Sequence, residues 1–209
     1  GDRDRSFTDV LLNGLASDGG LYVPNKFPCY NRRQLKALSK LNYSDLTFEL
    51  TKSFLSKDIP EEDYRKICED TYRNSFGKEI ISITKLNDSE YISNLFHGPT
   101  FAFKDFALQL LGNIYQFVLK KKNMKLVIIG ATSGDTGSAA INGCSKSNHI
   151  KMYILFPRGK VSEVQRKQMT TFDKENVFNV AVEGNFDDCQ KIVKDFFKMN
   201  NENKKINLA

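Results

Sequence analysis

The stretch "KLVIIGATSGDTGSAAINGC", residues 125–144, decides the fold. Its first part, "KLVIIG", is a short apolar run of the kind that forms a buried strand. The next part, "ATSGDTG", combines glycines with short polar side chains, which is typical of a turn, and "SAAINGCSKS" then favours a helix. The sequence therefore predicts a strand that enters a polar loop and leaves it through the N-terminus of a helix.

Two further strand–helix units follow this one. The strand-like "KMYILFP" precedes the helical "SEVQRKQMTTF", and "VFNVAV" precedes "FDDCQKIVKDFFKM". Buried strands that alternate with helices indicate βαβ units and a parallel sheet with both faces covered. We therefore expect an α/β fold with a doubly wound, mostly parallel sheet.

The earlier part of the chain reads differently, because it is rich in helix signals. We expect a helical N-terminal segment over residues 1–79 and the α/β domain, truncated at its C-terminal side, over residues 80–209. The α/β domain would open with two strands, "IISIT" and "YISNLF", and the long amphipathic helix "FALQLLGNIYQFVLKK". The expected helix starts in the first segment are Ser6, Asn31 and Ser44 as N-caps and Pro60 as a first helical residue.

Lys104 stands in an unusual setting in "HGPTFAFKDFALQLLG", residues 97–112. It lies in or near the first turn of the expected helix, where the positive end of the helix dipole disfavours a cation. Phe101, Phe103 and Phe106 add apolar neighbours. A lysine that is more often neutral suits Schiff-base chemistry, since only the free amine attacks an aldehyde. The alternative is an ordinary surface lysine that pairs with Asp105.

The loop after "KLVIIG" is the second candidate for chemistry. In an open parallel sheet, ligands bind beyond the carboxyl ends of the strands. Gly134 and Gly137 allow close approach to a ligand, Ser133, Asp135 and Thr136 offer polar contacts, and the following helix N-terminus attracts anions. The loop is neither a dinucleotide fingerprint nor a Walker A loop. An ordinary strand-to-helix turn would look the same.

Composition argues against several other classes of protein. The chain of 209 residues is 40% hydrophobic with a net charge of +6, but its lysines are dispersed, and the one tight run, "LKKKNMK", closes an expected helix. We therefore expect no nucleic-acid partner. The apolar runs are too short to span a membrane, and "GDRDRSFTDVL" carries no secretory signal, which predicts a cytoplasmic location. Four scattered cysteines without paired spacing predict buried thiols and no metal site.

Several motifs in register resemble one family. "HGPTFAFKDFALQLLG", "ATSGDTGSAA", "FPRGKVSEVQRKQMT" and "VEGNFDDCQKIVKDFF" are similar in order and spacing to the pyridoxal-phosphate enzymes of the threonine synthase family. "GLASDGGLYVP" resembles the family's N-terminal segment, so the resemblance covers essentially the whole chain. It implies the fold of the fold-type II, tryptophan synthase β-like enzymes, with pyridoxal 5'-phosphate as cofactor.

The resemblance also implies roles for individual residues. The family's "FKD" lysine forms the internal aldimine and shuttles protons, which falls on Lys104 as the catalytic and cofactor-binding residue. Asp135 takes a position near the cofactor ring where related enzymes have an asparagine. The Ser-Gly-Asp-Thr-Gly loop would hold the substrate carboxylate. The substrate-binding set expected on this basis is Ser133, Gly134, Asp135, Thr136 and Gly137, with phosphate contacts at His97, Thr100, Arg158 and Lys160.

The implied reaction is the last step of threonine biosynthesis. It converts O-phospho-L-homoserine and water to L-threonine and phosphate. The family's downstream glycine-rich loop for the cofactor phosphate has no counterpart here, and "EGNFDD" near Gly184 has the wrong place in the strand–helix order. The chain therefore resembles the N-terminal part only, and we expect it to be weakly active or inactive alone, with its missing C-terminal half or a second copy as partner.

Two other functions stay open at this point. A threonine synthase-like phospho-lyase would release phosphate and a keto acid without making threonine. A non-catalytic fragment with the same fold would bind small anions. For the phosphate contacts, the turn at Arg158, Gly159 and Lys160 could be merely exposed, and His97 could be a satisfied residue at a strand end.

Overall fold

The computed structural model describes residues 3–55, 57–203 and 206–209, and it divides into two compact units. The first unit reaches to Asn74 and the second is Ser75–Ala209. The units thus divide a few residues before the boundary at 79/80 that the sequence suggested, so residues 75–79 belong to the second unit.

Among the described residues of the first unit, all regular secondary structure is helical. Two of its helix starts follow the expected capping pattern: the Ser6 hydroxyl accepts from the Asp9 N–H (3.1 Å), and Asn31 forms a capping box with Gln34. The N-cap predicted at Ser44 is wrong, because Asn42 accepts from the Asp45 N–H (2.9 Å) and the helix starts earlier. Pro60 lies just before its helix, not inside it. The four helices are α1 (Phe7–Asn13), α2 (Arg32–Leu38), α3 (Tyr43–Leu55) and α4 (Glu61–Ser75).

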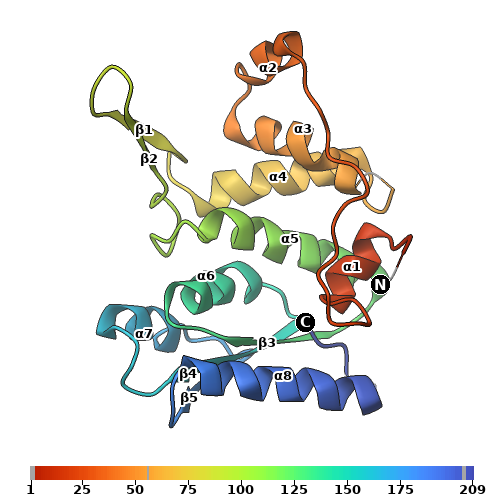
Figure 1. Cartoon of the computed structure of the whole chain (residues 1–209), viewed down its shortest axis with the longest axis vertical. Helices are drawn as coiled ribbons and strands as arrows, with labels where there is room; N and C mark the ends of the chain where they lie inside the picture. The colour runs from red at the N-terminus through yellow and green to blue at the C-terminus, as the bar shows by residue number, and fades with distance from the viewer. Residues whose placement is uncertain (1–2, 56, 204–205) are drawn as a thin grey trace. The chain divides into compact units, whose positions relative to one another are not determined.

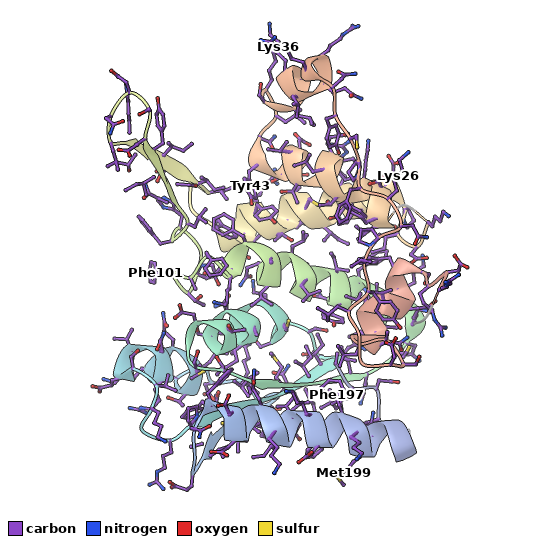
Figure 2. All side chains as sticks on the ribbon, in the orientation of Figure 1. Lys26, Lys36, Tyr43, Phe101, Phe197 and Met199 are labelled. Carbon is purple, nitrogen blue, oxygen red and sulfur yellow. The ribbon has the colours of Figure 1, made fainter. Side chains whose placement is uncertain are left out.

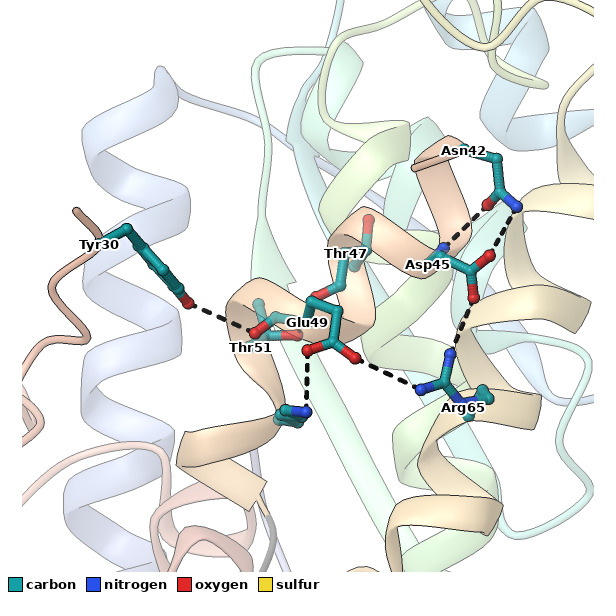
Figure 3. A network of polar contacts seen from close by, with 8 residues as sticks. Tyr30, Asn42, Asp45, Thr47, Glu49, Thr51 and Arg65 are labelled. Carbon is teal, nitrogen blue, oxygen red and sulfur yellow. Dashed lines mark hydrogen bonds and ion pairs between the residues drawn. The ribbon is translucent and has the colours of Figure 1, made fainter. Parts of the chain in front are cut away.

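Helices α3 and α4 are joined by both apolar and polar contacts. Phe48 and Tyr64 are buried with their ring centroids 5.8 Å apart. On the outer side, the Arg65 guanidinium of α4 bonds to Asp45 (2.9 Å) and Glu49 (3.4 Å) of α3, as Figure 3 shows. These ion pairs are partly exposed to solvent, so the buried rings contribute most of the stability between the two helices.

The second unit contains the expected α/β fold. It opens with an antiparallel hairpin, and then strands and helices alternate. The three later strands form one parallel sheet in the order β3-β4-β5, which confirms the predicted fold class. The elements are β1 (Ser82–Lys85), β2 (Tyr91–Asn94), α5 (Asp105–Lys122), β3 (Leu126–Ala131), α6 (Asp135–Cys144), β4 (Ile150–Pro157), α7 (Glu163–Thr170), β5 (Val177–Val182) and α8 (Phe186–Asn203).

Helices cover both faces of this sheet. Figure 1 shows α6 and α5 on one side of β3 and β4 and α8 on the other. Between α8 and the sheet, a hydrophobic core forms around Ile129, Leu155 and Cys189. Phe197 of α8 packs against this core, whereas Met199 points away from the sheet and is 62% exposed (Figure 2). Leu208 forms a parallel bridge with Val127, so the residues after α8 return to the free edge of β3.

Helices α5 and α6 approach each other through glycines. A side chain at Gly112 would collide with the backbone carbonyl of Gly143, and one at Gly143 would collide with that of Leu108. Only glycine allows two helix backbones to come this close. This contact fixes the packing of α5 against α6. It therefore also fixes the positions of the turn that precedes α5 and the loop that precedes α6.

The cysteines follow the sequence expectation at three of four positions. Cys68, Cys144 and Cys189 are buried and unpaired, and burial raises the pKa of the Cys144 thiol to about 12. Cys29 is exposed, contrary to the expectation of buried thiols. None of the helices among the described residues has both the length and the apolar character needed to cross a bilayer.

Candidate active site

The loops that carry the predicted residues leave one edge of the parallel sheet. Ala131 at the end of β3 pairs with Leu155 of β4, and Pro157 at the end of β4 pairs with Val182 of β5. The carboxyl ends of the three strands therefore lie side by side, at the edge where α/β proteins bind ligands. The loop 132–137 follows β3, and the turn 157–160 follows β4.

The loop 132–137 is organised around one buried hydroxyl. The Thr132 side chain, only 2% exposed, accepts from the backbone N–H groups of Gly134 (3.0 Å) and Gly137 (2.8 Å). Gly134 has a φ of +142°, a conformation that side chains rarely adopt. The loop is thus held largely by hydrogen bonds between the Thr132 hydroxyl and its own backbone N–H groups.

The polar side chains predicted to bind ligand face solvent at the start of α6. The helix begins at Asp135, three residues earlier than the sequence pattern suggested, because Gly134 serves as the N-cap. Ser133, Asp135 and Thr136 are all exposed, and within the described residues no hydrogen bond is recorded for the N–H groups of Asp135 and Thr136. A helix start with free N–H groups and short hydroxyls is suited to a carboxylate or phosphate.

Lys104 is the N-cap residue of α5, so it stands directly before the helix, as its sequence position suggested. It is half-buried, and its Nζ lies 4.4 Å from the centroid of the Phe103 ring, within the range of a cation–π contact. Phe101 and Phe103 are 73% and 60% exposed, so they do not enclose the lysine as the sequence suggested.

Asp105 does not pair with Lys104. Its carboxylate is buried and accepts from both the N–H and the hydroxyl of Thr100, each at 2.8 Å. Burial raises the pKa of Asp105, and the hydrogen bonds from Thr100 offset part of that effect. Across the parts of the chain that the structure describes, no ion pair joins Asp105 to Lys104, so the ordinary-surface-pair interpretation is not supported.

The turn before Lys104 is strained. Phe101 has a φ of +60°, which is costly for a bulky side chain, and its N–H donates to the Gly98 carbonyl (3.1 Å). The bidentate contact between Thr100 and Asp105 is what holds the turn in this conformation. Strain of this kind persists only where surrounding contacts fix it, and it is concentrated at functional sites.

The remaining predicted residues are less integrated. His97 Nε2 lies 2.8 Å from the Ser82 hydroxyl, next to the β1–β2 hairpin. Arg158 and Lys160 lie on an exposed turn, with Arg158 in an ion pair with Glu183. The Thr100 hydroxyl donates to Asp105, so it is already engaged as a donor.

Three residues at the site were missed by the sequence interpretation: Thr132, Gln165 and Gln168. The last two lie on α7, where Gln165 bonds to Asp135 (2.6 Å) and Gln168 bonds to the Thr100 carbonyl (3.1 Å). Their spacing of three on an expected helix placed them on one face, which was the available signal. Asp105 was considered in the sequence only as a partner of Lys104, and its contact with Thr100 was not predicted.

Comparison with known proteins points to one family. A family model described as the N terminus of threonine synthase matches residues 1–72. The threonine synthase of Pseudomonas aeruginosa is 49% identical over 192 residues, which are 92% of this chain and 41% of that protein. The crystal structure of a PLP-bound threonine synthase from Brucella melitensis superposes with a TM-score of 0.89 and 38% identity over 98% of this chain and 44% of that one.

By sequence and by fold, the chain is similar to the N-terminal portion of threonine synthases. It spans about two fifths of the length of the curated relatives that it matches. A protein called threonine synthase-like 2, from Rattus norvegicus, is 36% identical over 193 residues, 92% of this chain and 40% of that protein. The resemblance found in the sequence motifs is thus confirmed.

Proposed function

We propose that this chain provides the lysine-bearing part of a pyridoxal-phosphate-dependent threonine synthase. The reaction would convert O-phospho-L-homoserine and water to L-threonine and phosphate. One observation carries the proposal: the chain, with Lys104 as the N-cap of α5 and with α6 starting at Asp135, superposes on a PLP-bound threonine synthase with a TM-score of 0.89.

The residues present fit this cofactor in their chemistry. An aldehyde needs a primary amine that solvent can reach, and Lys104 is half-buried and held at a helix start by the fixed turn before it. The α6 N-terminus offers N–H donors and a positive dipole end to the anionic groups of cofactor or substrate. The Asp135 carboxylate lies at the same helix start and would face the cofactor ring.

In this proposal Lys104 would hold the cofactor through its amine and then transfer protons at the α and β carbons of the substrate. When bound, pyridoxal phosphate supplies an electron sink for negative charge at the α carbon. The Thr100–Asp105 hydrogen bonds would help Lys104 in this role, because they keep its backbone in one position. Loss of the substrate phosphate and addition of water at the β carbon then complete the conversion.

The substrate would be bound at both of its anionic ends. The loop 133–137, with the hydroxyls of Ser133 and Thr136 and the free N–H groups of α6, would bind the carboxylate. The phosphate would contact His97, Arg158 and Lys160, and Thr100 would join them by turning its hydroxyl from Asp105 to the phosphate. We further propose a cytoplasmic location, and as partner a second copy or the part of the protein that follows this chain.

A second candidate function has its own support. Two proteins called threonine synthase-like 2 are 36% identical to this chain over 92% of its length, so the similarity extends to proteins with a separate name. The second candidate is a phospho-lyase that would convert O-phospho-L-homoserine and water to phosphate, ammonia and a keto acid without making threonine. A non-catalytic anion-binding fragment is the third possibility that the experiment below separates.

The test is a chimera in which this chain replaces the matching two fifths of the P. aeruginosa threonine synthase. We expect threonine and phosphate to form in equal amounts from O-phospho-L-homoserine, and both to disappear with Lys104→Ala. Phosphate with a keto acid and no threonine would identify the phospho-lyase. No product from a folded chimera, with the parent enzyme active, would indicate a non-catalytic fragment.

A further inference from the structure

Helix α7 contacts both loops of the proposed site with one face. Gln165, Gln168 and Met169 follow each other at spacings of three and one, so they lie together on the helix surface. Gln165 reaches the loop 132–137, Gln168 reaches the turn before Lys104, and Met169 is fully buried against Gly137. A single short helix therefore touches the segments that carry Asp135 and Lys104.

Gln165 is fixed by contacts on both sides of its amide. Its Oε1 accepts from the Ser162 hydroxyl (2.8 Å), and its backbone N–H donates to the same hydroxyl (3.3 Å), which is the N-cap of α7. Its Nε2 donates to Asp135 Oδ1 (2.6 Å). The amide therefore connects the start of α7 to the start of α6, and it holds the Asp135 carboxylate in one orientation.

Gln168 has a corresponding role at the other loop. Its Nε2 donates to the Thr100 carbonyl (3.1 Å), and the N–H and hydroxyl of Thr100 bind Asp105, the residue after Lys104. The strained Phe101 lies between these contacts. The turn is thus held by two sets of contacts. Thr100 and Asp105 bond to each other within the segment, and Gln168 bonds to the Thr100 carbonyl from α7.

We propose that Gln165 and Gln168 of α7 are positioning residues that set the distance between the loop of Asp135 and the turn of Lys104. The catalytic part of this inference rests on the proposed function. Neither glutamine would touch the reacting atoms; each acts through a hydrogen bond to a segment that does. A Met169 side chain buried against Gly137 keeps α7 in register while the two amides fix the loops.

Gln→Glu substitutions remove the amide donor with almost no change in shape. At position 165, glutamate keeps the acceptor for Ser162 and suits this third position of a capped helix, so α7 should stay folded. Its carboxylate would face Asp135 and repel it. Arg166→Gln changes the charge by the same amount at an exposed position of α7 and serves as the matched control.

Two readouts separate positioning from simple stability. Hydrogen exchange without cofactor should become about tenfold faster at the Gly137 and Ser138 amides in Gln165→Glu, and at the Thr100 and Phe101 amides in Gln168→Glu. The affinity for pyridoxal phosphate should fall by about tenfold in each variant. Arg166→Gln should stay within about twofold of the unchanged chain in both readouts.

A swapped pair tests the Gln165 contact directly. Asp135→Asn combined with Gln165→Glu restores an amide facing a carboxylate, with donor and acceptor exchanged. We expect this double variant to recover slow exchange at the Gly137 and Ser138 amides, and exchange is the readout here because Asp135 itself belongs to the proposed cofactor site.

Unchanged exchange in Gln165→Glu and Gln168→Glu, or no recovery in the swapped pair, would overturn the positioning role. The proposed function fails by a different result, namely no cofactor adduct on Lys104 in the unchanged chain. The exchange measurements would then still decide whether α7 holds the two loops.

Discussion

The loop 132–137 and the turn 157–160 follow neighbouring parallel strands at the same edge of one sheet, yet they are built differently. The loop is held by the buried Thr132 hydroxyl and by Gln165, whereas the turn is exposed and its Arg158 pairs with Glu183 in solvent. Both carry residues that the sequence predicted to bind substrate. The loop is thus held by a buried side chain, whereas the one ion pair of the turn is exposed.

This difference suggests which predicted residues can contribute most to the reaction. Groups held by buried hydrogen bonds lose little conformational freedom when they bind a ligand, whereas an exposed arginine must first leave its ion pair and become ordered. We therefore expect substitutions in the loop 132–137 and the turn of Lys104 to change both stability and binding. Substitutions of the exposed residues 158–160 should lower stability less.

The largest effect is expected from a matched pair of glycine substitutions. Both Gly134 and Gly159 have positive φ, +142° and +68°, but a side chain at Gly134 would meet the Gln165 amide, whereas nothing lies within 4 Å of one at Gly159. Gly134→Ala should lower the free energy of unfolding by about 3 kcal/mol, because strain is added to the loss of the Gln165 contacts. Gly159→Ala should cost about 1 kcal/mol.

Urea denaturation of the two variants measures this difference. Equal costs at the two glycines would show that the contact with Gln165 adds nothing and that the loop is no more constrained than the turn. The comparison also checks the Gln165 hydrogen bonds independently of any cofactor.

A pH-dependent effect of intermediate size is expected at Asp105. Because burial raises its pKa in the folded protein, its contribution to stability is fully present below the ordinary value of 3.8 and is lost as the pH rises through the raised value. Asp105→Asn cannot ionise, so the stability of the unchanged chain relative to this variant should fall as the pH rises from below 3.8 to neutral.

Urea denaturation of both proteins over that pH range gives the difference directly, since other groups cancel. If the stability of the unchanged chain relative to Asp105→Asn instead rises with pH, the result contradicts the account. It would mean that the two hydrogen bonds from Thr100 outweigh the burial of the carboxylate.

The smallest effect on stability is expected at the turn. Arg158 and Glu183 have side chains that are 71% and 77% exposed, so Arg158→Ala should change the free energy of unfolding by about 0.5 kcal/mol or less. If Arg158 contacts the substrate phosphate as proposed, the same variant should bind O-phospho-L-homoserine about tenfold more weakly. Calorimetric titration measures that affinity, and unchanged binding would remove Arg158 from the proposed site.

The fold could be predicted from the sequence wherever hydrophobic pattern decided it. The strand "VFNVAV" has the bounds that its pattern indicated, Val177–Val182, and the alternation of strands with helices gave the parallel sheet. Helix starts were less predictable. Asn42 and Ser44 are both good N-caps in sequence, and only the structure shows that Asn42 caps the helix.

The site was predictable only in part, for a physical reason. The position of Lys104 before a helix and the polar loop after β3 are local features, and local sequence signals them. The contacts from Gln165 to Asp135 and from Gln168 to Thr100 join residues distant in the chain, so no local pattern specifies them. The exposure of a side chain also depends on which distant parts of the chain cover it. The apolar character of Phe101 and Phe103 therefore did not reveal that both are exposed.

The measurement that tests the central claim most directly is borohydride trapping of pyridoxal phosphate on the purified chain, followed by peptide mass mapping. Lys146, whose pKa is lowered by burial, is the competing amine and Lys146→Gln the control. The account predicts one dominant adduct on Lys104 that persists in Lys146→Gln and disappears in Lys104→Ala. Adducts scattered over many lysines, or labelling unchanged by Lys104→Ala, would contradict it.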